Sequence, residues 1–261
     1  MTDKTLDKST LYRKVILVPG GSGGLGSALV TLLAREGAAL VVGYRSNRQR
    51  AEALASSLQD ECDCSVTLIG GELTDPDVRR QYLEASTKNG GAPYGLACFT
   101  GDPGRVEFSS ASRQEMLPSL TSNYIGPLLM ARDCASAMKS ERVSGAIVFL
   151  SSMQAVGLFP GSYNYSGPKA ALIHTAQTMA KEMGGGSEGI RVNVVAPGVN
   201  RAGMALESIE SGKYDYFVEQ GIIPRFGRAE DVARVVRLLL EPDNYLTGQV
   251  ITVDGGLTLR S

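Results

Sequence analysis

Short apolar runs alternate with longer amphipathic stretches along almost the whole chain. The apolar runs span four to six residues and are nearly continuous, which is typical of parallel strands buried on both faces. This pattern predicts strands at Val15–Val18, Leu40–Gly43, Val66–Ile69, Leu96–Thr100, Ala146–Ser151, Arg191–Val195 and Val250–Val253.

Between these runs, apolar residues recur three and four positions apart, the spacing of one helix face. The alternation of strands and helices predicts the α/β class: a Rossmann-type, doubly wound parallel sheet in a three-layer α/β/α arrangement. The expected helices are Leu25–Glu36, Arg48–Leu58, Pro76–Ser86, Ser112–Leu117, Leu120–Met138, Lys169–Met183 and Asp231–Leu240.

The segment from 202 to 224 breaks this regularity. It contains Gly203, Gly212 and Gly221 and shows weak periodicity, whereas the other breaks are short. No shift in composition marks a domain boundary. We therefore expect residues 1–261 to form a single domain, with a mobile substrate flap near 202–224.

Composition and charge exclude several classes of function. The chain has 26 basic and 27 acidic residues, and this balance provides no field to attract nucleic acid or an anionic membrane. No apolar run approaches a membrane span, and the first fourteen residues lack the apolar stretch of a signal peptide. The four cysteines have no histidine cluster beside them, so we expect no metal site and a reduced, cytoplasmic protein.

A glycine-rich loop follows the first predicted strand and leads into the first predicted helix. Gly20, Gly24 and Gly26 allow the backbone to approach a pyrophosphate, and the helix N-terminus offers free N–H groups. An ordinary glycine-rich turn would look similar, but the position in the first strand–helix unit favours a dinucleotide site. A nucleotide-triphosphate loop is disfavoured because no Lys-Ser/Thr pair follows.

The end of the second strand bears on which nicotinamide cofactor binds. A carboxylate there would bind the ribose of NAD, but the residues from 43 to 47 are Gly, Tyr, Arg, Ser and Asn. Arg45 can pair with a 2′-phosphate, and Ser46 and Asn47 can donate to it. We therefore expect NADP(H) to be preferred. The alternative is a solvated surface arginine, and NAD(H) stays possible.

Ser152, Tyr165 and Lys169 form the candidate catalytic set. Tyr165 and Lys169 are four residues apart and share one helix face, and Pro168 is expected in the first helical turn. Lys169 and the positive nicotinamide ring are together expected to lower the pKa of Tyr165, which would then act as general acid or base. Ser152 can hydrogen-bond the reacting oxygen. A Tyr-x-x-x-Lys spacing alone is more often a surface pair, and a serine pair after a strand is more often a turn. Their joint placement after the glycine loop is what indicates a catalytic set.

With these motifs, residues 11–258 resemble the short-chain dehydrogenase/reductase family in its compact single-domain branch, with 3-oxoacyl-acyl carrier protein reductases among the most similar members. The family's catalytic positions match Asn123, Ser152, Tyr165 and Lys169. In the family, the asparagine bends a helix and holds a water, and the lysine also binds the nicotinamide ribose. The resemblance implies cofactor contacts at Gly20, Ser22, Gly24, Leu25, Gly26, Arg45, Ser46, Glu72, Leu73, Thr100, Gly101, Tyr165, Lys169, Pro197, Gly198 and Asn200.

Three departures from the family pattern concern the cofactor site. Residues 98–101 are Cys-Phe-Thr-Gly where Asn-Asn-Ala-Gly is usual, and Glu72 replaces an aspartate near the adenine. Asn200 and Ala202 replace the usual isoleucine and threonine, and we expect Asn200 to substitute for the missing threonine. Activity should survive these changes, with an altered cofactor affinity.

The resemblance implies an NADP(H)-dependent oxidoreductase that moves a hydride between nicotinamide and a small ketone or secondary alcohol. The alternative is a non-catalytic NADP(H) sensor on the same fold, which would bind the cofactor without turnover. The helices Leu120–Met138 and Lys169–Met183 form the family's usual subunit faces, which implies a homotetramer. The sequence leaves the natural substrate and the direction of the reaction open.

Overall fold

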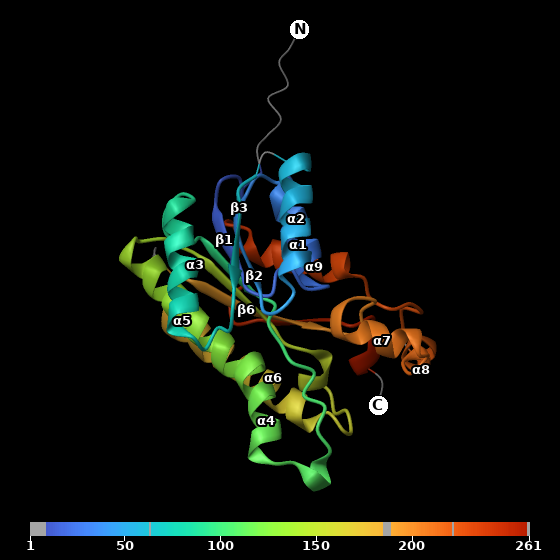
Figure 1. Ribbon diagram of the computed structural model, residues 1–261. Helices are drawn as coiled ribbons and strands as arrows, with labels where there is room; N and C mark the ends of the chain where they lie inside the picture. Colours follow the sequence, from blue (N-terminus) through green and yellow to red (C-terminus); the bar gives the residue numbers. More distant parts are fainter. Residues whose placement is uncertain (1–8, 63, 185–188, 221, 260–261) are drawn as a thin grey trace.

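The computed structural model describes residues 9–62, 64–184, 189–220 and 222–259. A seven-stranded parallel sheet forms its centre, in the order β3-β2-β1-β4-β5-β6-β7 (Figure 1). The predicted doubly wound sheet is confirmed, and each predicted strand is present to within two residues at either end. The strands are β1 Val15–Val18, β2 Ala39–Tyr44, β3 Val66–Gly70, β4 Gly95–Cys98, β5 Ala146–Leu150, β6 Arg191–Pro197 and β7 Val250–Val253.

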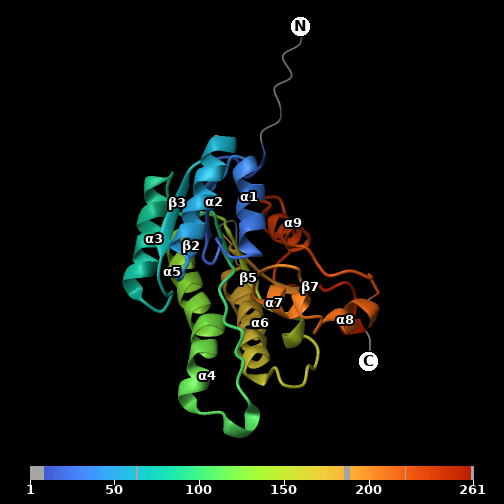
Figure 2. The same cartoon turned by 45° about the vertical axis from the view of Figure 1, so that its right-hand side comes forward.

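Helices cover both faces of the sheet and bury two apolar clusters against it (Figure 2). One cluster includes Leu29 and Val236, from helices that pack on each other across one face, and the other includes Met130 and Leu172. The first face carries α1 Gly26–Arg35, α2 Arg48–Glu61 and α9 Ala229–Leu240. The second carries α3 Pro76–Lys88, α5 Gly126–Ser140 and α6 Tyr163–Met183.

One helical run replaces two of the predicted helices. The sequence predicts separate helices at Ser112–Leu117 and Leu120–Met138. In the structure α4 Arg113–Leu120 continues through a π-helical turn, Thr121–Ile125, directly into α5. A π turn holds one more residue than an α turn, and such turns often mark functional sites. Asn123 lies at its centre and is fully buried.

The first turn of α6 also differs from the prediction. The helix was expected from Lys169, with Pro168 in its first turn, but it begins at Tyr163, so Pro168 lies inside it. A proline inside a helix removes the N–H that would bond to the carbonyl four residues earlier. That carbonyl belongs to Asn164, and it accepts a hydrogen bond from Ser119 Oγ at 2.5 Å instead. The helix is therefore tolerated because another element satisfies the freed carbonyl.

The predicted flap contains short helices. They are a 3-10 turn at Gly203–Ala205, α7 Leu206–Glu210 and α8 Asp215–Gln220. Ser208 and Ile209 are buried, so α7 is packed against the body of the protein. Gly221, which the prediction included, lies outside the described residues. The mobility of this segment stays a prediction.

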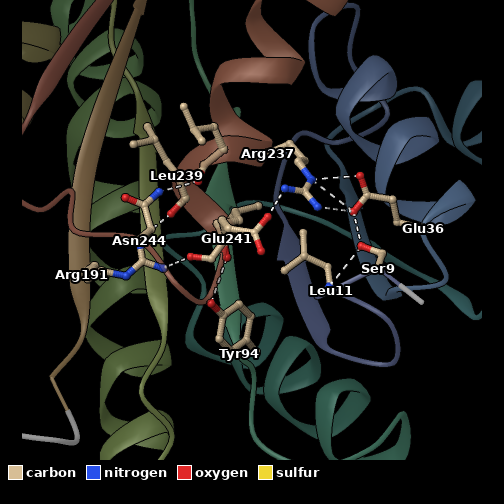
Figure 3. Close-up of polar contacts among 11 residues, drawn as sticks. Ser9, Leu11, Glu36, Tyr94, Arg191, Arg237, Leu239, Glu241 and Asn244 are labelled. Atoms are coloured by element: carbon tan, nitrogen blue, oxygen red, sulfur yellow. Dashed lines mark hydrogen bonds and ion pairs between the residues drawn. The ribbon is translucent and has the colours of Figure 1, made fainter. Parts of the chain in front are cut away.

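A polar network closes the C-terminal end of α9 at the amino end of the sheet (Figure 3). The last carbonyls of a helix have no partners within the helix. Here Arg191 donates to the carbonyls of Leu239 and Glu241 at 2.8 and 2.7 Å. Tyr94 donates to Leu240 O at 2.9 Å, and the side chain of Asn244 donates to Leu238 O at 2.6 Å. The starts of β4 and β6 and the loop after α9 thus supply the partners that the helix lacks.

On the same side, Arg237 of α9 bridges to the helix beside it. Its Nε lies 2.9 Å from Glu36 Oε1, and Glu36 Oε2 accepts from Ser9 Oγ at 2.5 Å (Figure 3). Arg237 pairs with Glu241 as well. These contacts join the segment before β1 to the last helix of the fold.

None of the described helices is both long and apolar enough to cross a membrane. Within the described ranges, no group of three His, Cys, Asp or Glu side chains is arranged to hold a metal ion. Within the part of the chain that the structure describes, Cys62, Cys64, Cys98 and Cys134 form no disulfide bond.

Candidate active site

A cleft of about 900 Å³ lies at the carboxyl ends of the strands. The strand order reverses direction between β1 and β4, because β2 and β3 follow on one side of β1 and β4 to β7 follow on the other. Open α/β sheets bind ligands at this position. Every residue predicted to contact the cofactor lines this cleft, and so does Ser152. Asn123 does not line it and lies buried behind it.

The glycine loop fits a pyrophosphate. Gly20 has φ +74°, and a Cβ there would stand 2.8 Å from the carbonyl carbon and oxygen of Phe99. A Cβ on Gly26 would stand 2.6 Å from Gly20 O. The first turn of α1 has no side-chain cap and no acidic residue, so no side chain competes with an anion there, although Ser27 N already donates to Gly23 O at 2.9 Å.

Gly24 has a different role in this loop. A Cβ on Gly24 would overlap the backbone nitrogen of Gly203, so the backbone at 202–203 lies directly on the glycine loop. Two glycines meet where the phosphate loop and the predicted flap touch. The flap thus borders the cleft at its pyrophosphate end.

Arg45 and Glu72 face each other across the end of the cleft where the sequence predicts the adenosine of the cofactor. Arg45 Nε lies 3.7 Å from a carboxylate oxygen of Glu72, and a guanidinium nitrogen lies 3.5 Å from Ser122 Oγ. Both charged side chains are about half exposed. The sequence analysis overlooked Arg50, which also lines the cleft. Asn47 caps α2 by accepting from Arg50 N at 2.9 Å, so an N-cap asparagine followed three residues later by arginine was the available signal.

The two adjacent serines after β5 have different partners. Ser151 Oγ donates to the main-chain oxygen of Lys169 at 2.9 Å. Ser152 lies in the cleft, accepts from Gln154 N at 3.2 Å and is close enough to Tyr165 to lower the pKa of its hydroxyl. Ser151 is thus occupied in holding α6, whereas Ser152 is beside the tyrosine hydroxyl.

Lys169 is 2% exposed and is held by main-chain carbonyls. Its Nζ donates to Leu150 O at 2.7 Å and to Thr100 O at 3.2 Å. An ammonium has three N–H groups, so one is left for a ligand in the cleft. The ends of β4 and β5 therefore fix the lysine one helical turn beyond Tyr165.

The protein alone does not show the predicted lowering of the Tyr165 pKa by Lys169, and the share assigned to the nicotinamide ring stays a prediction. Burial raises the pKa of Tyr165, and the nearby Ser152 hydroxyl offsets part of this rise. Burial also lowers the pKa of Lys169 to about 8. The Lys169 ammonium does not lower the tyrosine pKa, since it is directed at Leu150 O and Thr100 O. Additional positive charge in the cleft is needed to favour tyrosinate.

The shifted pKa of Lys169 predicts a pH-dependent stability. Between its folded value near 8 and its unfolded value near ~10.4, the unfolded chain holds more protons, so the free energy of unfolding should rise with pH. We expect Lys169→Met to remove roughly 2 kcal/mol of this rise between about pH 7.5 and 9.5. Urea unfolding of both proteins without cofactor measures it.

The difference in pH dependence between wild type and Lys169→Met reports on Lys169, because the other titratable groups are present in both proteins. Burial raises the pKa of Cys98 to about 12 and also raises the pKa of Cys134, and both thiols act in the opposite sense. Equal pH slopes in wild type and Lys169→Met would contradict the prediction.

Asn123 holds the loop that follows β4. Its Oδ1 accepts from Asp102 N at 3.2 Å, and its Nδ2 donates to Asp102 O at 2.9 Å and to Ser119 Oγ at 2.9 Å. The side-chain amide is therefore engaged with protein atoms. It fixes a loop whose neighbours Gly101 and Pro103 line the cleft.

Asn200 and Ala202 line the part of the cleft where the sequence predicts the nicotinamide. Asn200 Nδ2 donates to Gly198 O at 2.8 Å, and its Oδ1 lies beside Gly227, buried and without a partner in the described chain. Ala202 is extended and has no side-chain polar group. Asn200 lines the cleft, but its amide is turned toward its own loop, so its contact with a cofactor stays a prediction.

Known proteins resemble this chain over nearly its whole length. A family profile described as enoyl-(acyl carrier protein) reductase matches residues 20–258. A 3-oxoacyl-acyl-carrier-protein reductase from Rattus norvegicus is 33% identical over 251 residues, which cover 95% of this chain and 99% of that protein. The enzyme of the same name from Thermotoga maritima is 30% identical over 252 residues, with the same coverage.

A solved structure shares the architecture as well. A short-chain type dehydrogenase/reductase from Mycobacterium ulcerans aligns with a TM-score of 0.87 at 25% identity, covering 96% of this chain and 91% of that one. The matched ranges include the glycine loop, the Ser–Tyr–Lys set and the segment after β6.

Proposed function

Since this chain belongs to the short-chain dehydrogenase/reductase family of oxidoreductases, we propose that it is an NADP(H)-dependent enzyme acting on a ketone or secondary alcohol. One observation carries the proposal: Ser152, Tyr165 and Lys169 meet in the same cleft as the glycine loop and the open N-terminus of α1. Binding of a dinucleotide and proton transfer thus share one continuous site.

The roles of the residues follow from their positions. When bound, the nicotinamide supplies the hydride to the carbonyl carbon or accepts it from the alcohol carbon. Tyr165 donates its phenolic proton to the carbonyl oxygen in reduction and takes it back in oxidation. Ser152 donates a hydrogen bond to the same oxygen. Lys169 has a free N–H for the ribose, and Asn123 holds the loop beside the substrate.

A panel of ketones and alcohols tests this proposal against the sensor alternative. Each substrate is mixed with NADPH or NADP⁺, and absorbance at the nicotinamide band follows turnover while fluorescence follows binding. An enzyme consumes the cofactor with at least one substrate class. Tight NADPH binding with no turnover anywhere on the panel would favour the sensor. The acyl-carrier-protein thioesters named for its relatives belong on the panel as 3-oxoacyl thioesters.

The preference for NADP(H) is attributed to two arginines at the adenosine end. Arg45→Ala and Arg50→Ala should each weaken NADPH binding about 10- to 100-fold, because a charge-assisted bond to phosphate contributes about 1.5–3 kcal/mol. NADH binding should change less than about twofold in each. Glu72→Gln should tighten NADPH binding, since it removes the carboxylate facing Arg45.

Arg48→Ala is the matched control for these variants. Arg48 lies on the same turn of α2 but pairs with Glu52 at 2.7 Å and does not line the cleft. Titration of NADPH and NADH fluorescence gives all the affinities. Equal losses for both cofactors in Arg45→Ala would refute the assignment to a 2′-phosphate.

We further propose a homotetramer and a cytoplasmic location. Along α5 and α6 runs a surface groove lined by apolar and basic side chains, including Leu128, Lys139 and Met183, which supports these helices as subunit faces. The lack of a disulfide among the four described cysteines agrees with a reducing compartment. Light scattering should give a mass four times that of the chain, and a monomeric mass at micromolar concentration would contradict the tetramer.

A further inference from the structure

A ring of buried hydrogen bonds lies behind the cleft, where α4 lies beside α6 (Figure 2). Ser119, Asn123 and Asn164 are 1%, 0% and 3% exposed. Asn123 Nδ2 donates to Ser119 Oγ at 2.9 Å, and Ser119 Oγ donates to Asn164 O at 2.5 Å. The serine hydroxyl therefore accepts from one element and donates to another.

The ring closes through the loop after β4. Asn164 Nδ2 donates to Gly104 O at 3.3 Å, while the amide of Asn123 bonds to both the N–H and the carbonyl of Asp102. Asp102 Oδ1 accepts from Gly104 N at 2.9 Å, which makes the loop stiff. Gly104 also lines the cleft. Three segments around the candidate site are thus held by one connected set of bonds.

Ser119 supplies the bond that Pro168 removes. In a regular helix the carbonyl of Asn164 would accept from the N–H of residue 168, and proline has none. Asn164 directly precedes Tyr165, so this carbonyl belongs to the turn that presents the phenol. A buried carbonyl without a partner is costly, and the protein meets this cost with a hydroxyl from a helix 45 residues earlier.

We propose that Ser119 is a positioning residue, whose hydroxyl fixes the turn carrying Tyr165 against Asn123 and the loop at 102–104. This inference rests on the proposed function, in which Tyr165 transfers the proton. Without the hydroxyl, a buried N–H of Asn123 and a buried carbonyl of Asn164 both lose their partner. A displacement of about 1 Å at a catalytic group can reduce turnover by as much as ~100-fold.

Ser119→Ala tests the inference. We expect kcat to fall at least about tenfold and KM for NADPH to change less than about twofold, because Ser119 does not line the cleft. Assays are made at a temperature where circular dichroism shows the variant to be folded. A merely structural role would lower Tm and leave kcat unchanged, and that result would overturn the proposal.

Pro168→Ala provides a rescue. Alanine restores an N–H that can bond to Asn164 O within the helix, so the double variant Ser119→Ala/Pro168→Ala should regain at least about threefold in kcat over Ser119→Ala. Pro168→Ala alone should stay within about twofold of wild type. Ser57→Ala, which removes an exposed hydroxyl bonded to Glu61 on α2, is the control and should also stay within about twofold. A double variant no faster than Ser119→Ala would overturn the assignment to Asn164.

Amide hydrogen exchange gives a second readout that needs no substrate. The segment 163–167 should exchange at least about tenfold faster in Ser119→Ala and return toward wild type in the double variant. If wild type turns over no substrate, the proposed function fails, while the exchange data still decide whether Ser119 orders this turn. Unchanged exchange in Ser119→Ala would overturn the positioning role whatever the activity.

Discussion

Tyr165→Phe is expected to lower kcat by about 10²–10⁴-fold while NADPH binding and the fold stay intact. The substitution removes only the phenolic oxygen, which lies in the cleft with Ser152. Phenylalanine fills the same space, so packing around the first turn of α6 should persist. The carbonyl oxygen would then lose its proton donor, and Ser152 and bulk water would have to replace it.

Tyr163→Phe is the matched control for this variant. Tyr163 lies two residues earlier on the same turn, its hydroxyl is buried without a partner in the described chain, and its ring packs edge-on against Phe108 at 5.1 Å. Removing that hydroxyl should change kcat by less than about threefold. Steady-state assays of both variants, with NADPH titrations, decide the matter. Normal turnover in Tyr165→Phe would rule out Tyr165 as general acid.

Arg79→Met is expected to lower the free energy of unfolding by about 2–4 kcal/mol. Arg79 is 5% exposed, and its Nε lies 2.7 Å from Asp133 Oδ2, joining α3 to α5. Its guanidinium also donates to Leu73 O at 2.6 Å. The variant leaves a buried carbonyl and a partly buried carboxylate unsatisfied. Asp133 is 23% exposed and keeps its pairing with Arg132, so the loss should stay below that of a fully buried pair.

Arg80→Met controls for the loss of a neighbouring charge. Arg80 pairs with Asp77 and Glu84, but all three side chains are more than half exposed, so we expect a change below about 1 kcal/mol. Urea unfolding at neutral pH measures both variants. Because Leu73 lines the cleft, Arg79→Met should also weaken NADPH binding, whereas Arg80→Met should not. Equal stabilities of the two variants would refute the importance of the buried pair.

Much of the fold could be predicted from the sequence because buried parallel strands leave a plain signal. A strand such as Ala146–Leu150 is apolar at every position, and all its residues are buried. Long-range polar contacts leave no such signal. The start of α6 was misplaced because the partner of the carbonyl freed by Pro168 is Ser119, which is far away in the sequence.

In the candidate site, too, the positions of the residues could be predicted from the sequence, whereas their long-range interactions could not. The predicted cofactor positions were assigned from local motifs, and they do gather in one cleft. The pKa of Tyr165 could not be predicted from its spacing to Lys169, since the outcome depends on burial and on what the ammonium contacts. Burial raises the pKa of Tyr165, and the Lys169 ammonium donates its two hydrogen bonds to the carbonyls of Leu150 and Thr100 instead.

The capped end of α9 has a consequence for how this protein tolerates change. Arg191, Tyr94 and Asn244 act at the amino end of the sheet, whereas the cleft lies at its carboxyl end. Effects of substitutions at distant sites without shared partners usually add. Changes at Arg191 should therefore alter thermal tolerance without altering specificity. A destabilising substitution in the cleft can therefore be offset by a stabilising one at the capped end of α9. The residues of the cleft can then vary while the amino end of the sheet preserves the fold.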